Sequence, residues 1–220
     1  MRDYNLYWEK CRRDENLTEL YGYLDMYRDM DCKEIDIFKE NNVVNVCDAA
    51  CGFGAYTLAL ATNGFKVYSF DISNTAVEIT KKGLQKYGIE YGAVKIASIL
   101  STGYTDGFFD GIVAHAVIDH LTRDDAINAL KELFRITKEN GLIWITFDIA
   151  EKEDYDEEHL LLDDGTMEYL NGTRKGLLFR PYDWDLIDDI IKGYNVIYRT
   201  ERANKERVVI LKNTVDNLFD

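Results

Sequence analysis

The sequence feature that most constrains the fold is a short apolar run that ends in two closely spaced glycines. Residues 43–47 are mostly β-branched and predict a buried strand, and the segment DAACGFG at residues 48–54 follows directly. Gly52 and Gly54 let the backbone turn sharply and approach a ligand closely. A helix is expected over residues 55–63, ended by Gly64, so this part of the chain predicts a strand, a glycine turn and a helix.

The rest of the chain repeats this alternation of strand and helix. Strands are expected over residues 65–70, 93–97, 109–115 and 142–147. Ser73 and Thr122 are predicted helix caps, Asp125 a box-like partner of Thr122, and the Asn-Gly pair at 140–141 the end of that second helix. The order predicts an α/β fold with a parallel sheet and helices on both faces, and residues 195–200 and 207–211 predict an antiparallel closing pair.

No repeat or linker divides the chain, so residues 1–220 are expected to form a single domain. Aromatic residues at helical spacing predict a helical cap over residues 1–41, ahead of a core over residues 42–150. Residues 151–182 are an acidic insert with turn signals, expected near the substrate mouth. A helix capped by Asp183 and the closing strands occupy residues 183–220.

The net charge of the chain limits the classes of partner that it is expected to bind. The chain carries 40 acidic and 26 basic residues and a formal net charge of −14, which disfavours binding to nucleic acid or to an anionic membrane surface. No apolar run approaches the roughly 20 residues of a membrane helix, and the N-terminus lacks the apolar core of a signal peptide. The sequence therefore predicts a cytoplasmic protein, as a monomer or homodimer.

The cysteines and acids predict no metal site. Cys47 and Cys51 lack a second pair at zinc-ligand spacing, so the four cysteines of the chain are expected to be reduced thiols. A magnesium site of the catechol-methyltransferase kind would need a cluster of acids, for which Asp119 and Asp148 are the available residues.

A carboxylate at the end of the second strand indicates what the glycine turn binds. Asp71 follows Gly54 by seventeen residues, and a carboxylate there can accept hydrogen bonds from both ribose hydroxyls of a nucleoside. The dinucleotide fingerprint requires a third glycine where this chain has Thr57, and Asp48 favours a cationic or amine-bearing ligand. S-adenosylmethionine, with its amine and sulfonium, therefore fits better than NAD. An NAD(P)-dependent oxidoreductase stays as the alternative.

The same residues carry a family resemblance. Residues 48–54 resemble the first motif of class I S-adenosylmethionine-dependent methyltransferases, and residues 109–115 with the DHL segment at 119–121 are similar to the family's fourth-strand region. The order of elements also looks like that of small-molecule methyltransferases of the type 11/12 and tellurite-resistance-like groups. The resemblance implies a Rossmann-like, seven-stranded, mostly parallel sheet with an antiparallel last strand. It also implies in-line methyl transfer from S-adenosylmethionine to a small-molecule acceptor.

Family position implies the roles of individual residues. The methionine end of the cofactor would lie at the first motif, the ribose at Asp71, and the adenine near the ends of the second and third strands. The implied cofactor residues are Asp48, Ala50, Cys51, Gly52, Gly54, Asp71, Ile72, Ser98, Ile99 and His115. Two of them depart from the family pattern. Ala50 replaces a glycine, where a positive φ would cost about 1 kcal/mol, and Ser98 replaces an acid that meets the adenine amino group.

Fewer sequence features indicate which residues would contact the methyl acceptor. Histidine is the residue type whose unperturbed pKa lies near neutrality, so His120 and His115 are candidate catalytic bases. Tyr4, Tyr7 and Trp8 are expected to form an aromatic lid that shields the sulfonium, and Arg180 and Tyr182 to line the substrate mouth. No Pro-Pro-Tyr-like element follows the fourth strand, which again disfavours nucleic acid. A non-catalytic protein that binds S-adenosylmethionine stays open.

Overall fold

The computed structural model describes residues 3–13 and 17–214 of the 220-residue chain. Residues 1–2 and 14–16 of the expected N-terminal cap, and residues 215–220 of the expected C-terminal segment, lie outside the described residues. Among the helices of the described part, none has the length and apolar character needed to cross a membrane.

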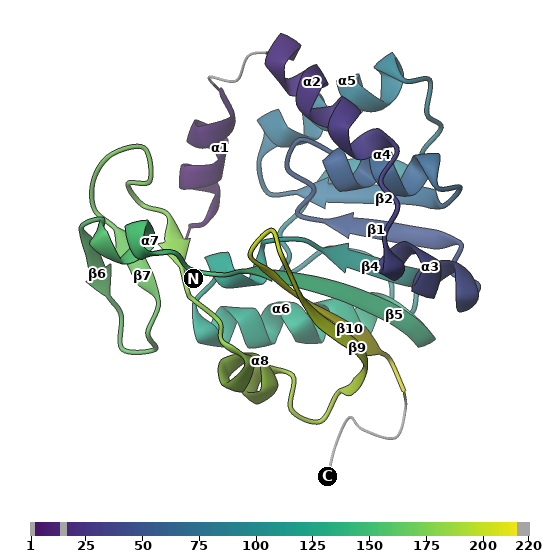
Figure 1. Ribbon diagram of the computed structural model, residues 1–220. Helices are drawn as coiled ribbons and strands as arrows, with labels where there is room; N and C mark the ends of the chain where they lie inside the picture. The colour runs from purple at the N-terminus through teal and green to yellow at the C-terminus, as the bar shows by residue number, and fades with distance from the viewer. Residues whose placement is uncertain (1–2, 14–16, 215–220) are drawn as a thin grey trace.

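A seven-stranded sheet forms the centre of the molecule (Figure 1). Its strands are β1 (Asn45–Ala49), β2 (Lys66–Asp71), β3 (Ala93–Ile96), β4 (Phe109–Ala114), β5 (Thr137–Asp148), β9 (Asn195–Arg202) and β10 (Glu206–Lys212). In space they follow the order β3-β2-β1-β4-β5-β10-β9. Strands β3, β2, β1, β4 and β5 pair in parallel, and β10 pairs antiparallel with both β5 and β9. This topology confirms the predicted Rossmann-like sheet.

Helices cover both faces of this sheet because its central strands are apolar on both sides. Helices α3 (Lys33–Glu40), α4 (Ala55–Thr62) and α5 (Asn74–Lys86) cover one face, and α2 (Leu17–Arg28) packs on α4. Helices α6 (Arg123–Ile136) and α8 (Trp184–Ile190) cover the other. Alternation along β5 divides its side chains, since Trp144 joins the core under α3 and α4 whereas Ile143 and Ile145 join the core under α6.

The start of β5 differs from the prediction. Helix α6 ends at Ile136 and β5 begins at Thr137, so the prediction that the helix continues to residues 140–141 is wrong. Asn140 has a φ of 62°, and a Cβ on Gly141 would lie 2.6 Å from Cγ2 of Thr137. The Asn-Gly pair therefore forms an irregularity inside β5, where the pairing with β4 shifts register.

The predicted caps form with one change. The side chains of Ser73, Thr122 and Asp183 accept hydrogen bonds from the backbone N–H groups of Ala76, Asp125 and Leu186, as the sequence predicts. The carboxylate of Asp125 does not complete a capping box. It accepts a hydrogen bond from the hydroxyl of Tyr4 at 2.6 Å instead, because α1 (Asn5–Arg13) packs close to the start of α6.

The acidic insert folds into a small unit beside α1 (Figure 1). It contains α7 (Lys152–Asp156) and an antiparallel sheet of β6 (His159–Leu161), β7 (Met167–Tyr169) and β8 (Leu178–Phe179). Buried Met167, Tyr169 and Phe179 form an apolar cluster, against which Tyr7 and Trp8 of α1 pack. The insert thus supports the helix that lies above the carboxyl ends of the parallel strands.

A buried ion network fixes the C-terminal hairpin to the rest of the domain. The guanidinium of Arg202 lies 2.6 Å from a carboxylate oxygen of Glu34 on α3 and 2.6 Å from one of Glu206 on β10. Both glutamates are almost fully buried, with exposures of 2% and 3%. Removal of the guanidinium would take a cationic partner from two buried carboxylates. Losing one partner of a buried ion pair destabilises a fold more than replacing the whole pair by apolar side chains.

We expect Arg202→Met to lower the free energy of unfolding by about 3 kcal/mol, because it leaves buried Glu34 without its cation and leaves Glu206 with His115 alone. Arg199→Met on the same strand is the control, since Arg199 pairs with Asp188 at the surface and should contribute less than about 1 kcal/mol. Urea unfolding of both variants measures the difference. Equal losses would show that the buried network contributes no more than a surface pair.

Candidate functional site

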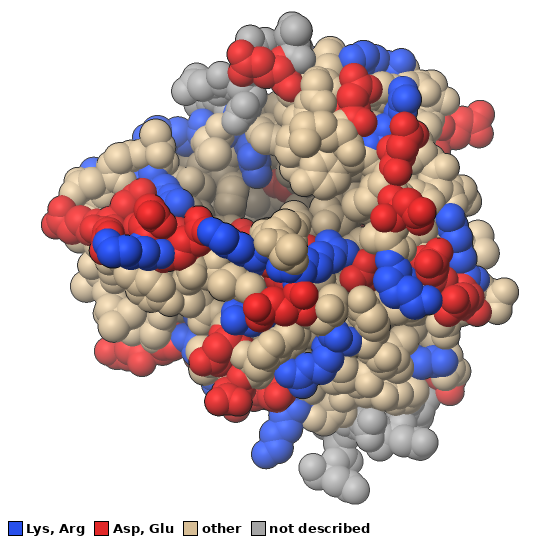
Figure 2. Space-filling model, in the orientation of Figure 1, with Lys and Arg blue, Asp and Glu red and all other residues tan. Residues whose placement is uncertain are grey.

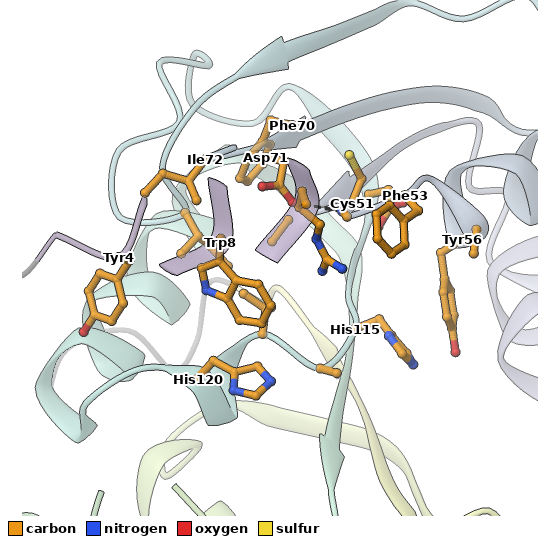
Figure 3. A pocket seen from close by; sticks show the side chains of 18 of the residues that line it. Tyr4, Trp8, Cys51, Phe53, Tyr56, Phe70, Asp71, Ile72, His115 and His120 are labelled. Atoms are coloured by element: carbon orange, nitrogen blue, oxygen red, sulfur yellow. Dashed lines mark hydrogen bonds between the residues drawn. The ribbon is translucent and has the colours of Figure 1, made fainter. Parts of the chain in front are cut away.

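A cavity of about 580 Å³ lies at the carboxyl ends of β1, β2 and β4, beneath α1. Figure 2 shows the hollow between the insert and the upper helices, and Figure 3 shows the side chains that line it. Between β1 and β4 the chain order of the sheet reverses, and open α/β sheets bind their ligands at such a point. The cavity therefore lies where the glycine turn predicts a ligand.

The turn after β1 runs through left-handed backbone. Ala50, Gly52 and Gly54 have φ values of 59°, 53° and 85°. A Cβ on Gly54 would lie 2.8 Å from Cγ2 of Thr80, so this position also needs glycine for lack of space. Ala50 holds a conformation that costs a residue with a Cβ about 1–2 kcal/mol, and the surrounding turn maintains it.

Asp71 joins the glycine turn to the next helix. Its Oδ2 accepts a hydrogen bond from the backbone N–H of Gly52 at 2.9 Å, and its Oδ1 accepts one from Ser73 at 2.8 Å. Burial raises the pKa of Asp71, and these two N–H donors oppose the rise. Each oxygen keeps a lone pair for a further donor, and the residue lines the cavity.

Asp48 lies deeper, at the end of β1. Its Oδ2 accepts a hydrogen bond from the Thr57 hydroxyl at 2.6 Å, and that hydroxyl also lies 2.9 Å from the Ser69 hydroxyl. Thr57 is fully buried in these contacts. Its side chain therefore occupies the position where a dinucleotide-binding turn has its third glycine. Burial raises the pKa of Asp48 to about 6, although the Thr57 hydrogen bond favours the charged form.

Helix α1 and the preceding Tyr4 cover the cavity, and hydrogen bonds hold this segment at two points. The Tyr4 hydroxyl bonds to Asp125, and the Glu9 carboxylate accepts hydrogen bonds from the hydroxyls of Ser73 and Thr75, both at 2.7 Å. Tyr4 and Trp8 line the cavity, whereas Tyr7 turns away into the apolar cluster of the insert. Of the three residues predicted to form an aromatic lid, two therefore reach the cavity.

Arg12 is a cavity residue that the sequence did not single out. Its guanidinium lies 4.1 Å from the ring centre of Phe53 and 5.2 Å from that of Trp8. One of its nitrogens would lie 3.5 Å from a Cβ on Gly52, which places the cation beside the glycine turn. The signal was present, since Arg12 follows Trp8 by one helical turn and shares its face.

The two candidate histidines have different surroundings. Nε2 of His115 lies 2.9 Å from the carboxylate of Glu206 on β10, and the His115 ring lies 4.2 Å from that of Tyr56. Nδ1 of His120 lies 2.8 Å from the backbone carbonyl of Leu178 in the insert. The His120 ring also meets the edge of Trp8, with centroids 5.1 Å apart (Figure 3). Both line the cavity.

Two predicted substrate residues lie elsewhere. Arg180 and Tyr182 are 5% and 1% exposed and lie outside the cavity lining, so the prediction that they line the substrate mouth needs correction. The insert folds them inward, and the backbone N–H of Arg180 donates to the carbonyl of Asp119 at 2.7 Å. The remaining predicted cofactor residues at the cavity wall are Ala50, Cys51, Gly52, Ile72, Ser98 and Ile99, while Gly54 packs behind the turn against Thr80.

Comparison with known proteins places this arrangement in context. A family model described as a methyltransferase domain matches residues 47–145. An uncharacterized protein of Rickettsia prowazekii (strain Madrid E) is 31% identical over 104 residues, which cover 46% of this chain and 42% of that protein. A tRNA (carboxymethyluridine(34)-5-O)-methyltransferase of Arabidopsis thaliana is 33% identical over 110 residues, which cover 50% of this chain and 25% of that protein.

The chain thus spans less than half the length of these curated relatives. Among solved structures, a protein of Methanosarcina mazei described as an S-adenosylmethionine-dependent methyltransferase superposes with a TM-score of 0.68 at 17% identity. The match covers 84% of this chain and 99% of that one. At this identity the likeness concerns the fold.

The buried carboxyl of Asp48 leads to a prediction about how the stability of the fold depends on pH. Its folded-state pKa of about 6 lies above the ordinary value of 3.8, so the native state loses stability as pH rises through this interval and the buried carboxyl ionises. We expect the stability of Asp48→Asn relative to the parent to rise by up to about 3 kcal/mol between pH 4 and pH 7. Denaturant unfolding at a series of pH values measures it, and a flat difference would contradict the buried, ionisable state of Asp48.

Proposed function

We propose that this chain is a class I S-adenosylmethionine-dependent methyltransferase that methylates a small-molecule acceptor, since a methyltransferase-domain model matches its residues 47–145 and its fold is that of such enzymes. One observation carries the proposal. The carboxylate of Asp71 is fastened to the glycine turn and keeps its remaining lone pairs for a ligand in the cavity beneath α1. When bound, the cofactor supplies an electrophilic methyl group on a sulfonium.

Cofactor placement follows from the charges around the turn. We assign the amine of the methionyl part to Asp48, whose buried carboxyl gains a cationic partner. We assign the carboxylate of the same part to Arg12, whose guanidinium lies beside Gly52 against aromatic rings. We assign the ribose hydroxyls of the cofactor to Asp71, whose carboxylate accepts their hydrogen bonds.

The adenine is assigned to the cavity wall beyond the ribose. Ile72 and Ile99 supply apolar surface there. The Ser98 hydroxyl accepts a hydrogen bond from the N–H of Leu100 at 3.2 Å, which leaves its proton to donate to a ring nitrogen. A serine thus serves as a donor where the family has an acid.

The fold's contribution to the reaction is positioning in a covered site. Trp8 and Tyr4 cover the cavity from α1 and exclude water, while the glycine turn fixes the cofactor against the sheet. In-line displacement requires no nucleophile from the protein. The acceptor is expected to approach from the His120 end, opposite the glycine turn.

We assign different roles to the two histidines, and only His120 takes part in the removal of the acceptor's proton. His115 donates to Glu206 and stacks on Tyr56, so it is committed to holding the hairpin and the cavity wall. His120 donates through Nδ1 to a carbonyl, which leaves the Nε2 lone pair available. That lone pair either takes the acceptor's proton itself or holds a cation that makes the acceptor more acidic.

A small acceptor agrees better with the charge of this chain than a nucleic acid does. The Arabidopsis relative acts on a tRNA, but this chain has a net charge of −14. On the face shown in Figure 2, acidic and basic side chains alternate around the hollow without a continuous basic band. An oxidoreductase is disfavoured because Thr57 is buried where a pyrophosphate turn needs glycine.

Turnover with a panel of small hydroxyl, amine and thiol compounds tests the reaction. We expect one acceptor class to release S-adenosylhomocysteine in proportion to enzyme and time. Binding of S-adenosylmethionine without turnover on any member would favour a non-catalytic binding protein. Calorimetry that showed NAD binding and no S-adenosylmethionine binding would favour the oxidoreductase.

Cofactor affinity tests the assignment of Asp71. We expect Asp71→Ala to weaken S-adenosylmethionine binding by 1–3 kcal/mol, about 5- to 150-fold in Kd, because the ribose hydroxyls lose their acceptor. Asp183→Ala is the matched control, since Asp183 also bonds a helix N–H but lies outside the cavity. Titration calorimetry on both folded variants measures the effect, and an unchanged Kd for Asp71→Ala would refute the assignment.

A further inference from the structure

Three metal-ligating side chains gather beside the cavity, and one of them, His120, lines it. Asp119 and His120 lie in the short helix η1 (Ile118–His120) after β4, and Asp148 ends β5. One ligand atom from each lies within 4.8 Å of the other two. Neighbouring parallel strands end at the same edge of the sheet, which brings residues far apart in the sequence into one cluster.

Asp119 has a buried oxygen that lacks a partner. The side chain is fully buried, and its Oδ2 accepts a hydrogen bond from the N–H of Asp148 at 2.9 Å. Its Oδ1 has no hydrogen-bond partner, and within the described ranges no lysine or arginine forms an ion pair with Asp119 or Asp148. A buried carboxylate oxygen in this state is costly unless a cation or donor occupies the space before it.

His120 presents a lone pair to the same cluster. A carbonyl oxygen only accepts, so Nδ1 of His120 donates to Leu178, and Nε2 is the ring nitrogen left to act as a metal ligand. The rings of Trp8 and Phe179 lie around the imidazole, with centroids 5.1 and 6.0 Å from its own. A carbonyl on one ring nitrogen and an apolar surround are the features that orient metal-binding histidines.

We propose that Asp119, His120 and Asp148 bind one divalent first-row transition-metal ion. Two carboxylates and an imidazole suit manganese, iron or zinc, whereas magnesium prefers a set made of oxygens alone. Donors about 2.1 Å from one ion lie at most about 4.2 Å apart. Asp148 is exposed, so a small rotation of its side chain closes the remaining distance.

The role of the ion rests on the proposed function, whereas its binding does not. His120 lines the cavity, so a coordination position left open by three protein ligands faces the acceptor. An ion there lowers the pKa of a coordinated acceptor hydroxyl, whose proton leaves to water. The oxygen–methyl bond then forms as the methyl–sulfur bond breaks and its electron pair passes to sulfur. The substrate class is therefore a small molecule with a hydroxyl group.

Manganese binding to the full chain, after removal of metals with EDTA, tests the site directly. Free Mn²⁺ gives an electron paramagnetic resonance signal that decreases on binding, and thiols compete poorly for this ion. We expect one Mn²⁺ per chain, and at least about tenfold weaker binding in His120→Gln and Asp148→Asn. Asp119→Asn should behave alike, but the first two variants suffice if its buried position prevents folding.

His159→Gln is the matched control. Its Nδ1 also lies 2.7 Å from a backbone carbonyl, that of Glu157, but the ligand cluster does not include it. Equal Mn²⁺ affinity in the parent, His120→Gln and Asp148→Asn, or no binding to the folded parent, would overturn the proposal. Calorimetry with S-adenosylmethionine on the metal-free chain separates the two proposals, because cofactor binding without Mn²⁺ binding refutes the metal site alone.

Discussion

The carboxylate of Asp71 is the contact on which the rest of the site depends. It accepts backbone N–H groups from the turn after β1 and from the start of α5, so one side chain sets the distance between two neighbouring strand ends. Burial penalises its charge and raises its pKa, and the two donors offset part of that rise. The left-handed turn at residues 50–54 is maintained against its own backbone cost because this contact and the close packing of Thr80 hold it.

The two ends of the cavity are joined by α1 and the insert. Glu9 ties α1 to the first turn of α5 at the Asp71 end, while Tyr7 and Trp8 pack on the insert at the His120 end. The insert in turn places the Leu178 carbonyl against His120 and the Arg180 N–H against the Asp119 carbonyl. The backbone of the insert and its apolar cluster thus shape this end of the cavity.

His115 and His120 show how tertiary partners divide similar residues. The carboxylate of Glu206, on the antiparallel strand β10, accepts a hydrogen bond from Nε2 of His115, and Arg202 links the same glutamate to α3. His120 donates through Nδ1 to a backbone carbonyl of the insert. His115 therefore belongs to an ion network that joins β10 to α3, whereas His120 is held by the insert.

The sequence by itself determined the alternating sheet, the glycine turn, Asp71 and the helix caps, because these depend on local patterns of period, conformation and spacing. It misplaced the end of α6, where sheet pairing to β4 overrides a local Asn-Gly signal. Only the tertiary structure decided the inward position of Arg180 and Tyr182, the place of Arg12 beside the turn, and the grouping of Asp119 and His120 with Asp148. Such contacts join segments far apart in the chain, and the side-chain pattern of one segment carries no information about which other segment will lie against it.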